Sequence, residues 1–96
     1  MPAYVHINLR VIDPAKQAAL VPRFQAALRE AGGHILHFGP VVRSLEGEEE
    51  PLPLAGVLEF PTLAQALAFY ESERYAPIKA ERAEAQQAIM FVVETP

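Results

Sequence analysis

The stretch Tyr4–Val11 reads YVHINLRV, and apolar and polar side chains alternate along all of it. This alternation predicts a β-strand with one apolar face and one polar face, because successive side chains of a strand point to opposite sides. The apolar set is Val5, Ile7, Leu9 and Val11, and the polar set is Tyr4, His6, Asn8 and Arg10. In so short a chain the polar face is either open to water or covered by a second subunit, so we expect any function to lie there.

The chain has 96 residues, of which 51% are hydrophobic. That length predicts one domain over residues 1–96, and a domain of this size buries only about 60–65% of the surface that its unfolded chain exposes. One small layer of helices on a sheet hides less apolar surface than this composition supplies. We therefore expect a homodimer, in which a second copy of the chain covers the excess.

Charge and composition also limit the partners and the location that we expect. Eight Lys and Arg against twelve Asp and Glu give a net charge of −4, and the basic residues are scattered, so we expect no nucleic-acid partner. No apolar run approaches the roughly 18 residues of a membrane span, and no basic leader precedes the first strand. We accordingly expect a cytoplasmic protein without a membrane partner. The absence of cysteine excludes disulfides and thiolate chemistry.

The first helix has clear boundary signals. Asp13 followed by Pro14 is typical of a helix start, and Gly32 with Gly33 is typical of a stop. These signals frame a helix of about five turns, and Pro22 inside it predicts a kink because proline removes one backbone hydrogen bond.

The later elements follow in a regular order. They are an extended stretch His34–Leu45 interrupted at Gly39 and Pro40, a strand Leu54–Phe60, a short helix opened by the capping pair Thr62 and Gln65, a helix over Ile78–Ala85 and an apolar final strand Ala88–Glu94. The final strand is of the type covered on both faces. On the short helix we expect Tyr70 in the core and Phe69 outside it.

This order predicts an α+β fold, the ferredoxin-like βαββαβ sandwich with a four-stranded antiparallel or mixed sheet. We expect the first and third strands to lie side by side and parallel in the middle, with the second and fourth strands outside them. Both helical regions then cover one face of the sheet. The other face, which carries His6 and Asn8, is left without a cover.

Several segments together resemble the domain-of-unknown-function family thirteen-thirty. They are Ala3–Val5, Asp13–Pro14, Gly32–Gly33, Leu45–Gly47, Leu58–Pro61 and Phe69–Pro77, in the same order and over nearly the whole chain. That family belongs to the dimeric α/β barrel superfamily, whose members pair two ferredoxin-like sheets face to face. The resemblance implies that a second copy covers the bare face. Relatives in the superfamily include cofactor-independent monooxygenases, small isomerases and heme-binding enzymes, so the fold alone selects no chemistry.

The candidate chemical groups lie on the uncovered face. Strand alternation places His6, Asn8 and Glu59 there, with Tyr4, Arg10 and Val57 beside them. A histidine near a carboxylate is the smallest set of groups for proton transfer, so His6 is the candidate base, Asn8 a hydrogen-bonding orienter and Glu59 the carboxylate. The same three side chains could equally satisfy one another's hydrogen bonds at a dimer interface.

The remaining predictions concern the lining of the cavity and the surface. For a ligand we expect contacts from Tyr4, His6, Asn8, His37, Val57, Glu59, Phe69, Met90 and Val92. His34 and His37 are three residues apart, which on a regular strand sends them to opposite faces, so we expect no metal site and no cofactor. Tyr75 is expected to anchor packing, and Arg74, Lys79 and Arg82 to lie exposed.

Two classes of function stay open. In the first, the protein is a cofactor-independent enzyme that acts by proton transfer or oxygen activation, with His6 as base. In the second, it binds a small organic ligand, or forms a dimer with a purely structural role, and catalyses nothing. No motif in the sequence names a substrate.

Overall fold

The four strands form one sheet in the order β2-β3-β1-β4, and each neighbouring pair is antiparallel. The computed structural model describes all 96 residues, Met1–Pro96. In chain order the elements are β1 (Ala3–Val11), α1 (Pro14–Glu30), β2 (His34–Pro40), β3 (Leu54–Phe60), α2 (Leu63–Glu71), α3 (Ala76–Ala85) and β4 (Gln86–Glu94). This is the predicted ferredoxin-like α+β fold, with its second helical region divided into α2 and α3.

The strand order was predicted, but the parallel pairing of the first and third strands is wrong. Strand β1 runs antiparallel to β3, with His6 opposite Val57. The reason is the connection between β2 and β3, which is a hairpin and reverses the chain. Helix α1 returns the chain so that β2 runs in the same direction as β1, and β3 therefore has to run against both.

The local signals at the helix ends act as expected. The Asp13 carboxylate accepts a hydrogen bond from the backbone N–H of Lys16 at 3.1 Å, and α1 continues through Pro22 to Glu30. Gly32 follows with a φ of 84°, a left-handed conformation that favours glycine. At the start of α2, the Thr62 hydroxyl accepts from the backbone N–H of Gln65 at 3.1 Å.

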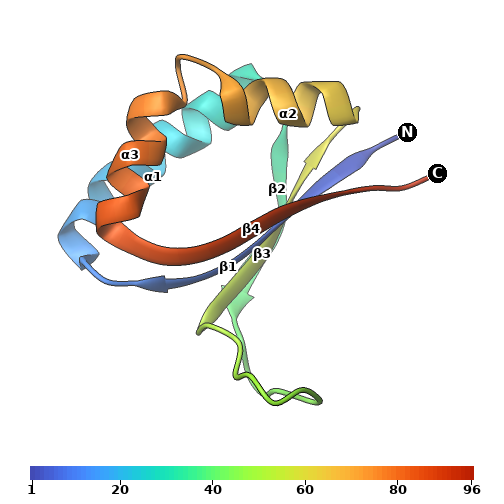
Figure 1. The fold of residues 1–96 in the computed structure, drawn as a ribbon. Coiled ribbons are helices and arrows are strands. Elements are labelled where there is room, and N and C mark those ends of the chain that lie inside the picture. The colour runs from blue at the N-terminus through green and yellow to red at the C-terminus, as the bar shows by residue number, and fades with distance from the viewer.

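The three helices cover one face of the twisted sheet and leave the other bare, as Figure 1 shows. The core lies between these two layers and includes Ala3, Val5, Ile7, Leu9, Leu28, Leu58, Phe60, Ala66, Phe69, Tyr75 and Ile78. Phe69 is 5% exposed and Tyr70 is 40% exposed, so the prediction for this pair is reversed. Phe69 turns inward because it packs among aromatic rings, 5.5 Å from Phe60 and 4.6 Å from Tyr75 between centroids.

A chain of hydrogen-bonded polar side chains lies near the C-terminal end of α3. Arg82 was expected to be exposed, but only 9% of it is accessible to solvent. Its Nη1 donates to the Tyr75 hydroxyl at 2.8 Å, and its Nη2 donates to Gln86 Oε1 at 3.0 Å. Gln86 Nε2 in turn donates to Gln17 Oε1 on α1 at 2.8 Å. These contacts let Arg82 face inward, since its polar atoms find partners there.

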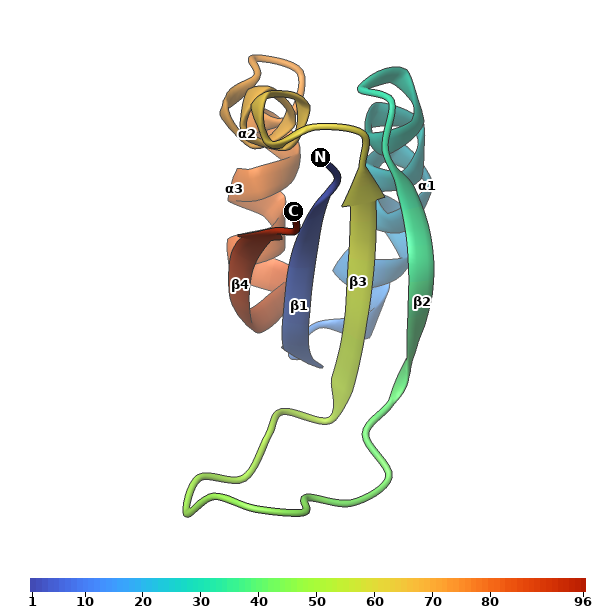
Figure 2. The same ribbon diagram turned by 90° about the vertical axis from the view of Figure 1, so that its right-hand side faces the viewer.

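Residues 41–53 leave the sheet as a long arm below it (Figure 2). We predicted that the second extended stretch reaches Leu45, but β2 ends at Pro40. Asn8 fixes the end of the arm that joins β3. Its Nδ2 donates to the carbonyls of Leu52 and Leu54 at 2.9 Å each, and its Oδ1 accepts from the Leu52 N–H at 3.0 Å. Between its two ends the arm is exposed to solvent, and the exposed fractions are 93% for Val42 and 80% for Leu45.

Strand β4 begins at Gln86, two residues before the predicted start, and was expected to be covered on both faces. In the single chain most of it is exposed. It is an edge strand of the sheet, and the helices cover only one of its faces.

Candidate binding face

The sheet surface opposite the helices is the candidate site, and we call it the open face. Directly opposite residues of an antiparallel pair point to the same side, so the register defines its members. They are Tyr4, His6 and Asn8 of β1, Val57 and Glu59 of β3, Ile89, Phe91 and Val93 of β4, and His34 and His37 of β2. The open face therefore combines apolar side chains on β4 with polar side chains on β1 and β2, and β3 contributes one side chain of each kind.

A β-bulge in β2 corrects the prediction for its two histidines. The register shifts between Ile35 and His37, so that His34 lies opposite Glu59 and His37 opposite Val57. The extra residue shifts the alternation of side chains by one position, and both histidines consequently point to the open face instead of to opposite faces. The open face nevertheless brings together no group of three or more side chains suited to hold a metal ion.

Two side chains, those of His34 and Tyr4, lie at the Glu59 carboxylate. Its Oε1 lies 3.0 Å from Nε2 of His34, and Tyr4 occupies the directly opposite position on β1. Hydrogen bonding to Glu59, partial desolvation and the negative charge of that carboxylate all raise the pKa of the Tyr4 hydroxyl above its usual 10.0. A carboxylate between a histidine and a phenol can accept a proton from either group or orient either group toward a ligand.

His6 lies at the centre of the open face. Its imidazole stacks on the ring of Phe91, with centroids 5.0 Å apart and planes within 3° of parallel. Its other cross-strand neighbour is Val57. An imidazole fixed between two apolar side chains is held in one orientation, with its nitrogens at the ring edge free to meet a bound molecule.

The structure separates several predicted site residues from this group. Asn8 lies on the open face, but its amide is engaged by the backbone of Leu52 and Leu54, so it anchors the arm instead of orienting His6. Met90 lies opposite Ile7, and Val92 lies opposite Val5. Both therefore point to the helix side, because the prediction for β4 was out of register by one residue.

Phe69 is also removed from the site, since it belongs to the core on the helix side. In return, the structure adds His34, Ile89, Phe91 and Val93, which sequence reasoning missed. For β4 the available signal was weak, because every residue from Ala88 to Val93 is apolar and no alternation reveals which side faces the helices. For His34 the deciding feature was the bulge, which the sequence indicated only as a disturbance near Gly39.

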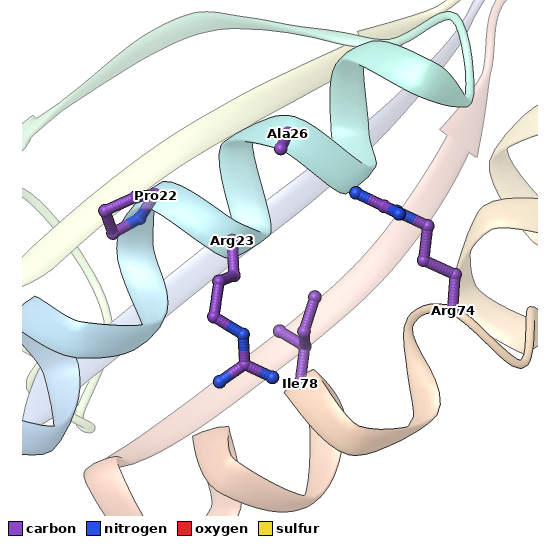
Figure 3. A pocket seen from close by; sticks show the side chains of 5 residues that line it. All are labelled: Pro22, Arg23, Ala26, Arg74 and Ile78. Atoms are coloured by element: carbon purple, nitrogen blue, oxygen red, sulfur yellow. The ribbon is translucent and has the colours of Figure 1, made fainter.

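Apart from the open face, a groove lies on the outside of the helix layer, between α1 and α3. It has a volume of about 360 Å³ and is lined by Pro22, Arg23, Ala26, Arg74 and Ile78 (Figure 3). Both arginines have acidic partners, since Arg23 contacts Glu81 at 2.5 Å and Arg74 contacts Glu30 at 2.9 Å. The groove is consequently a solvent-facing seam with neutralised charge.

The fold and the open face define the class: a ferredoxin-like domain with one covered and one bare sheet surface. None of its helices has the length and hydrophobicity needed to cross a membrane. Residues 2–96 match the family described as "Domain of unknown function (DUF1330)", and the chain belongs to that family, as the motifs indicated. No curated protein matches it significantly in sequence.

Solved structures show the same fold at low sequence identity. The RPA0582 protein of unknown function from Rhodopseudomonas palustris has a TM-score of 0.71 at 17% identity, covering 99% of this chain and 84% of that one. SnoaB, a cofactor-independent oxygenase from Streptomyces nogalater, has a TM-score of 0.71 at 8% identity, covering 99% and 93%. A dimeric ferredoxin-like protein of unknown function from Jannaschia sp. CCS1 has a TM-score of 0.70 at 14% identity, covering 99% and 100%.

Proposed function

We propose that two copies of the chain pair through their open faces and bind a small organic molecule between the sheets. The observation that carries this proposal is the composition of the open face, where apolar side chains of β4 stand on the same surface as His6 and the Tyr4–Glu59–His34 cluster. Phe91 is 55% exposed and Ile89 is 58% exposed in the single chain. A sheet normally buries its apolar face against another layer, and a second sheet would supply that layer.

The arm over residues 41–53 supports the same arrangement. It extends beyond the sheet (Figure 2), carries the exposed apolar side chains Val42 and Leu45, and is fixed at its end by Asn8. A second copy placed on the open face would bring apolar surface within reach of this arm. Relatives of the same fold are described as dimeric, among them the proteins from Jannaschia and Thermobifida fusca.

The occupant we propose is a small organic molecule with an apolar body and one or two polar groups. Phe91 and Ile89 would contact the apolar part, while His6 and the Tyr4–Glu59–His34 cluster would take hydrogen bonds. A mixed lining of this kind favours neither a metal ion nor a long polymer.

Native mass spectrometry of gently purified protein tests the proposal. We expect a dimer that carries a reproducible small-molecule adduct, and we expect Glu59→Gln to reduce the adduct's occupancy. Glu84→Gln is the matched control, because Glu84 pairs with Lys16 in the helix layer and faces solvent. A monomer would exclude the shared cavity, and a dimer whose adduct survives Glu59→Gln unchanged would place the ligand elsewhere.

A second candidate function is proton transfer on the same molecule, with His6 as base. What supports it is the imidazole of His6, which stacks on Phe91 on the same face as the Glu59 carboxylate and the Tyr4 phenol, together with the description of SnoaB as a cofactor-independent oxygenase. In this proposal His6 takes a proton from an acidic C–H or O–H group of the ligand and returns one to the product. Incubating the identified adduct with the protein in D₂O tests it: incorporation of deuterium that His6→Ala abolishes supports catalysis, and no incorporation leaves binding alone.

A further inference from the structure

A separate cavity of about 240 Å³ lies on the helix side of the sheet, between α1 and the strands. Most of its lining is apolar and comes from β1, α1, β2 and β3, including Ile7, Leu9, Leu20, Phe24, Ile35 and Leu58. Strand β2, which is an edge strand of the sheet, forms one side of it. Ile35 and Phe38 point to the helix side of β2, yet they are 40% and 49% exposed.

One wall of this cavity contains a buried positive charge. The three residues of the hydrogen-bonded chain near the C-terminal end of α3 all line this cavity; they are Arg82, Gln86 and Gln17. The partners of the Arg82 guanidinium are neutral, namely the Tyr75 hydroxyl and the Gln86 side-chain oxygen. No carboxylate lies within 4.0 Å of it, whereas Arg23 and Arg74 outside the helices each have one.

A buried cation without a counter-ion is costly to maintain, and a negative charge placed beside it would be strongly favoured. The guanidinium has five N–H donors, and its three hydrogen bonds in the structure leave two without a protein acceptor. The amide nitrogen of Gln17 adds a further donor nearby. The polar wall therefore presents donors and positive charge, and the rest of the cavity presents hydrocarbon.

We propose that this cavity binds a small carboxylate with an apolar body. The carboxylate accepts hydrogen bonds from Arg82 and from the Gln17 amide, and the apolar part lies between α1 and the sheet. A single guanidinium with neutral neighbours matches a monoanion better than a phosphate, which carries more charge and needs more donors. The volume is below the roughly 300–1,000 Å³ of pockets for drug-sized ligands, which limits the body to one ring or a short chain.

Two probes of equal size test the proposal on the unmodified protein. We would titrate ¹⁵N-labelled protein with 3-phenylpropanoate and with 3-phenylpropanamide, which differ in charge but not in the number of heavy atoms. We expect saturable shifts at Leu20, Phe24 and Ile35 with the carboxylate, and binding weaker by about tenfold or more with the amide. Equal affinity of the two probes, shifts confined to the open face, or no saturation by about 10 mM carboxylate would overturn it.

Paired variants then locate the charge. Arg82→Met should weaken 3-phenylpropanoate binding by about tenfold or more and leave the amide unaffected, whereas Arg74→Met, which removes the same charge from the outer groove, should change neither. Carboxylate binding that is unchanged in a folded Arg82→Met protein would overturn the assignment. Should that variant fail to fold, the comparison of the two probes still decides. Because these measurements do not depend on dimerisation, their failure leaves the proposal for the open face standing.

Discussion

Replacing Phe91 with Ala is the sharpest test of the proposed pairing of open faces. Its ring lies at the middle of β4 on that face, is 55% exposed in the single chain and stacks on His6. A phenylalanine exposes about 200 Å² when unfolded, so about 110 Å² of Phe91 remains for a partner to cover. At about 25 cal/mol per Å², covering it contributes about 2.7 kcal/mol per subunit.

A two-fold interface contains each residue twice, so the two rings together contribute up to about 5 kcal/mol to dimerisation. Even if a partner covers only half of that area, the loss amounts to about 2.7 kcal/mol, which raises the dimer dissociation constant about a hundredfold. Sedimentation equilibrium over a range of concentrations measures this constant directly. The matched control is Leu67→Ala, because Leu67 is 41% exposed but lies on α2 in the helix layer.

The expected result is a large rise in the dissociation constant for Phe91→Ala and little change for Leu67→Ala. A constant within about threefold of the unmodified protein's would refute the reasoning, since it would show that the Phe91 ring is not covered on association. An equal effect of both variants would locate the interface on the helix layer or show a general loss of structure. Circular dichroism separates these last two cases.

Three further predictions concern the folded chain. Gly33→Ala should lower the free energy of unfolding by about 1–3 kcal/mol, because the new Cβ would lie 2.6 Å from the ring of Phe60. Gly39→Ala is the control for urea unfolding and should change that free energy by less than about 0.5 kcal/mol, because its Cβ would have no neighbour within 4 Å. Asn8→Asp removes both donations to backbone carbonyls, so we expect cleavage within residues 41–53 by a non-specific protease to become faster. Burial raises the pKa of Tyr75 above 10.0, so the unfolded chain releases that proton first and the free energy of unfolding falls as the pH rises above 10. Urea unfolding between pH 9 and about 11.5 tests this prediction: a shallower fall in Tyr75→Phe than in the unmodified protein would confirm it, and an identical slope would contradict it.

How far the sequence predicts this molecule depends on the kind of signal. Local signals suffice where one residue determines the backbone: Asp13 and Thr62 begin helices, and the third strand has the expected bounds Leu54–Phe60. The alternation in β1 also places its faces correctly, since Ala3, Val5, Ile7 and Leu9 are buried. These features can be predicted because each is determined by nearest neighbours or by a strict period of two.

Several of the errors share one physical cause, which is that a face cannot be assigned without knowing what covers it. Strand β4 is apolar on both sides, so only its register with β1 decides that Phe91 faces away from the helices and Met90 toward them. Arg82 looks like a surface residue on a helical wheel, and its hydrogen bonds to the Tyr75 hydroxyl and the Gln86 side chain, at the two ends of α3, make its burial possible. Polar burial of this kind depends on which neighbouring side chains offer hydrogen-bond acceptors, and apolar periodicity does not register them.

The same reasoning explains how one sheet can carry both of the sites proposed above. Strand β1 contributes His6 to the open face and Ile7 to the cavity under α1, and these neighbouring residues point in opposite directions. Their chemistry also differs, because the open face combines a carboxylate with histidines, whereas the cavity contains a buried cation without a counter-ion. An anionic ligand is thus favoured beside Arg82 and disfavoured beside Glu59. If a carboxylate binds this protein, the side of the sheet that it occupies therefore follows from charge, and labelling the backbone amides of β1 distinguishes the two sides in one experiment.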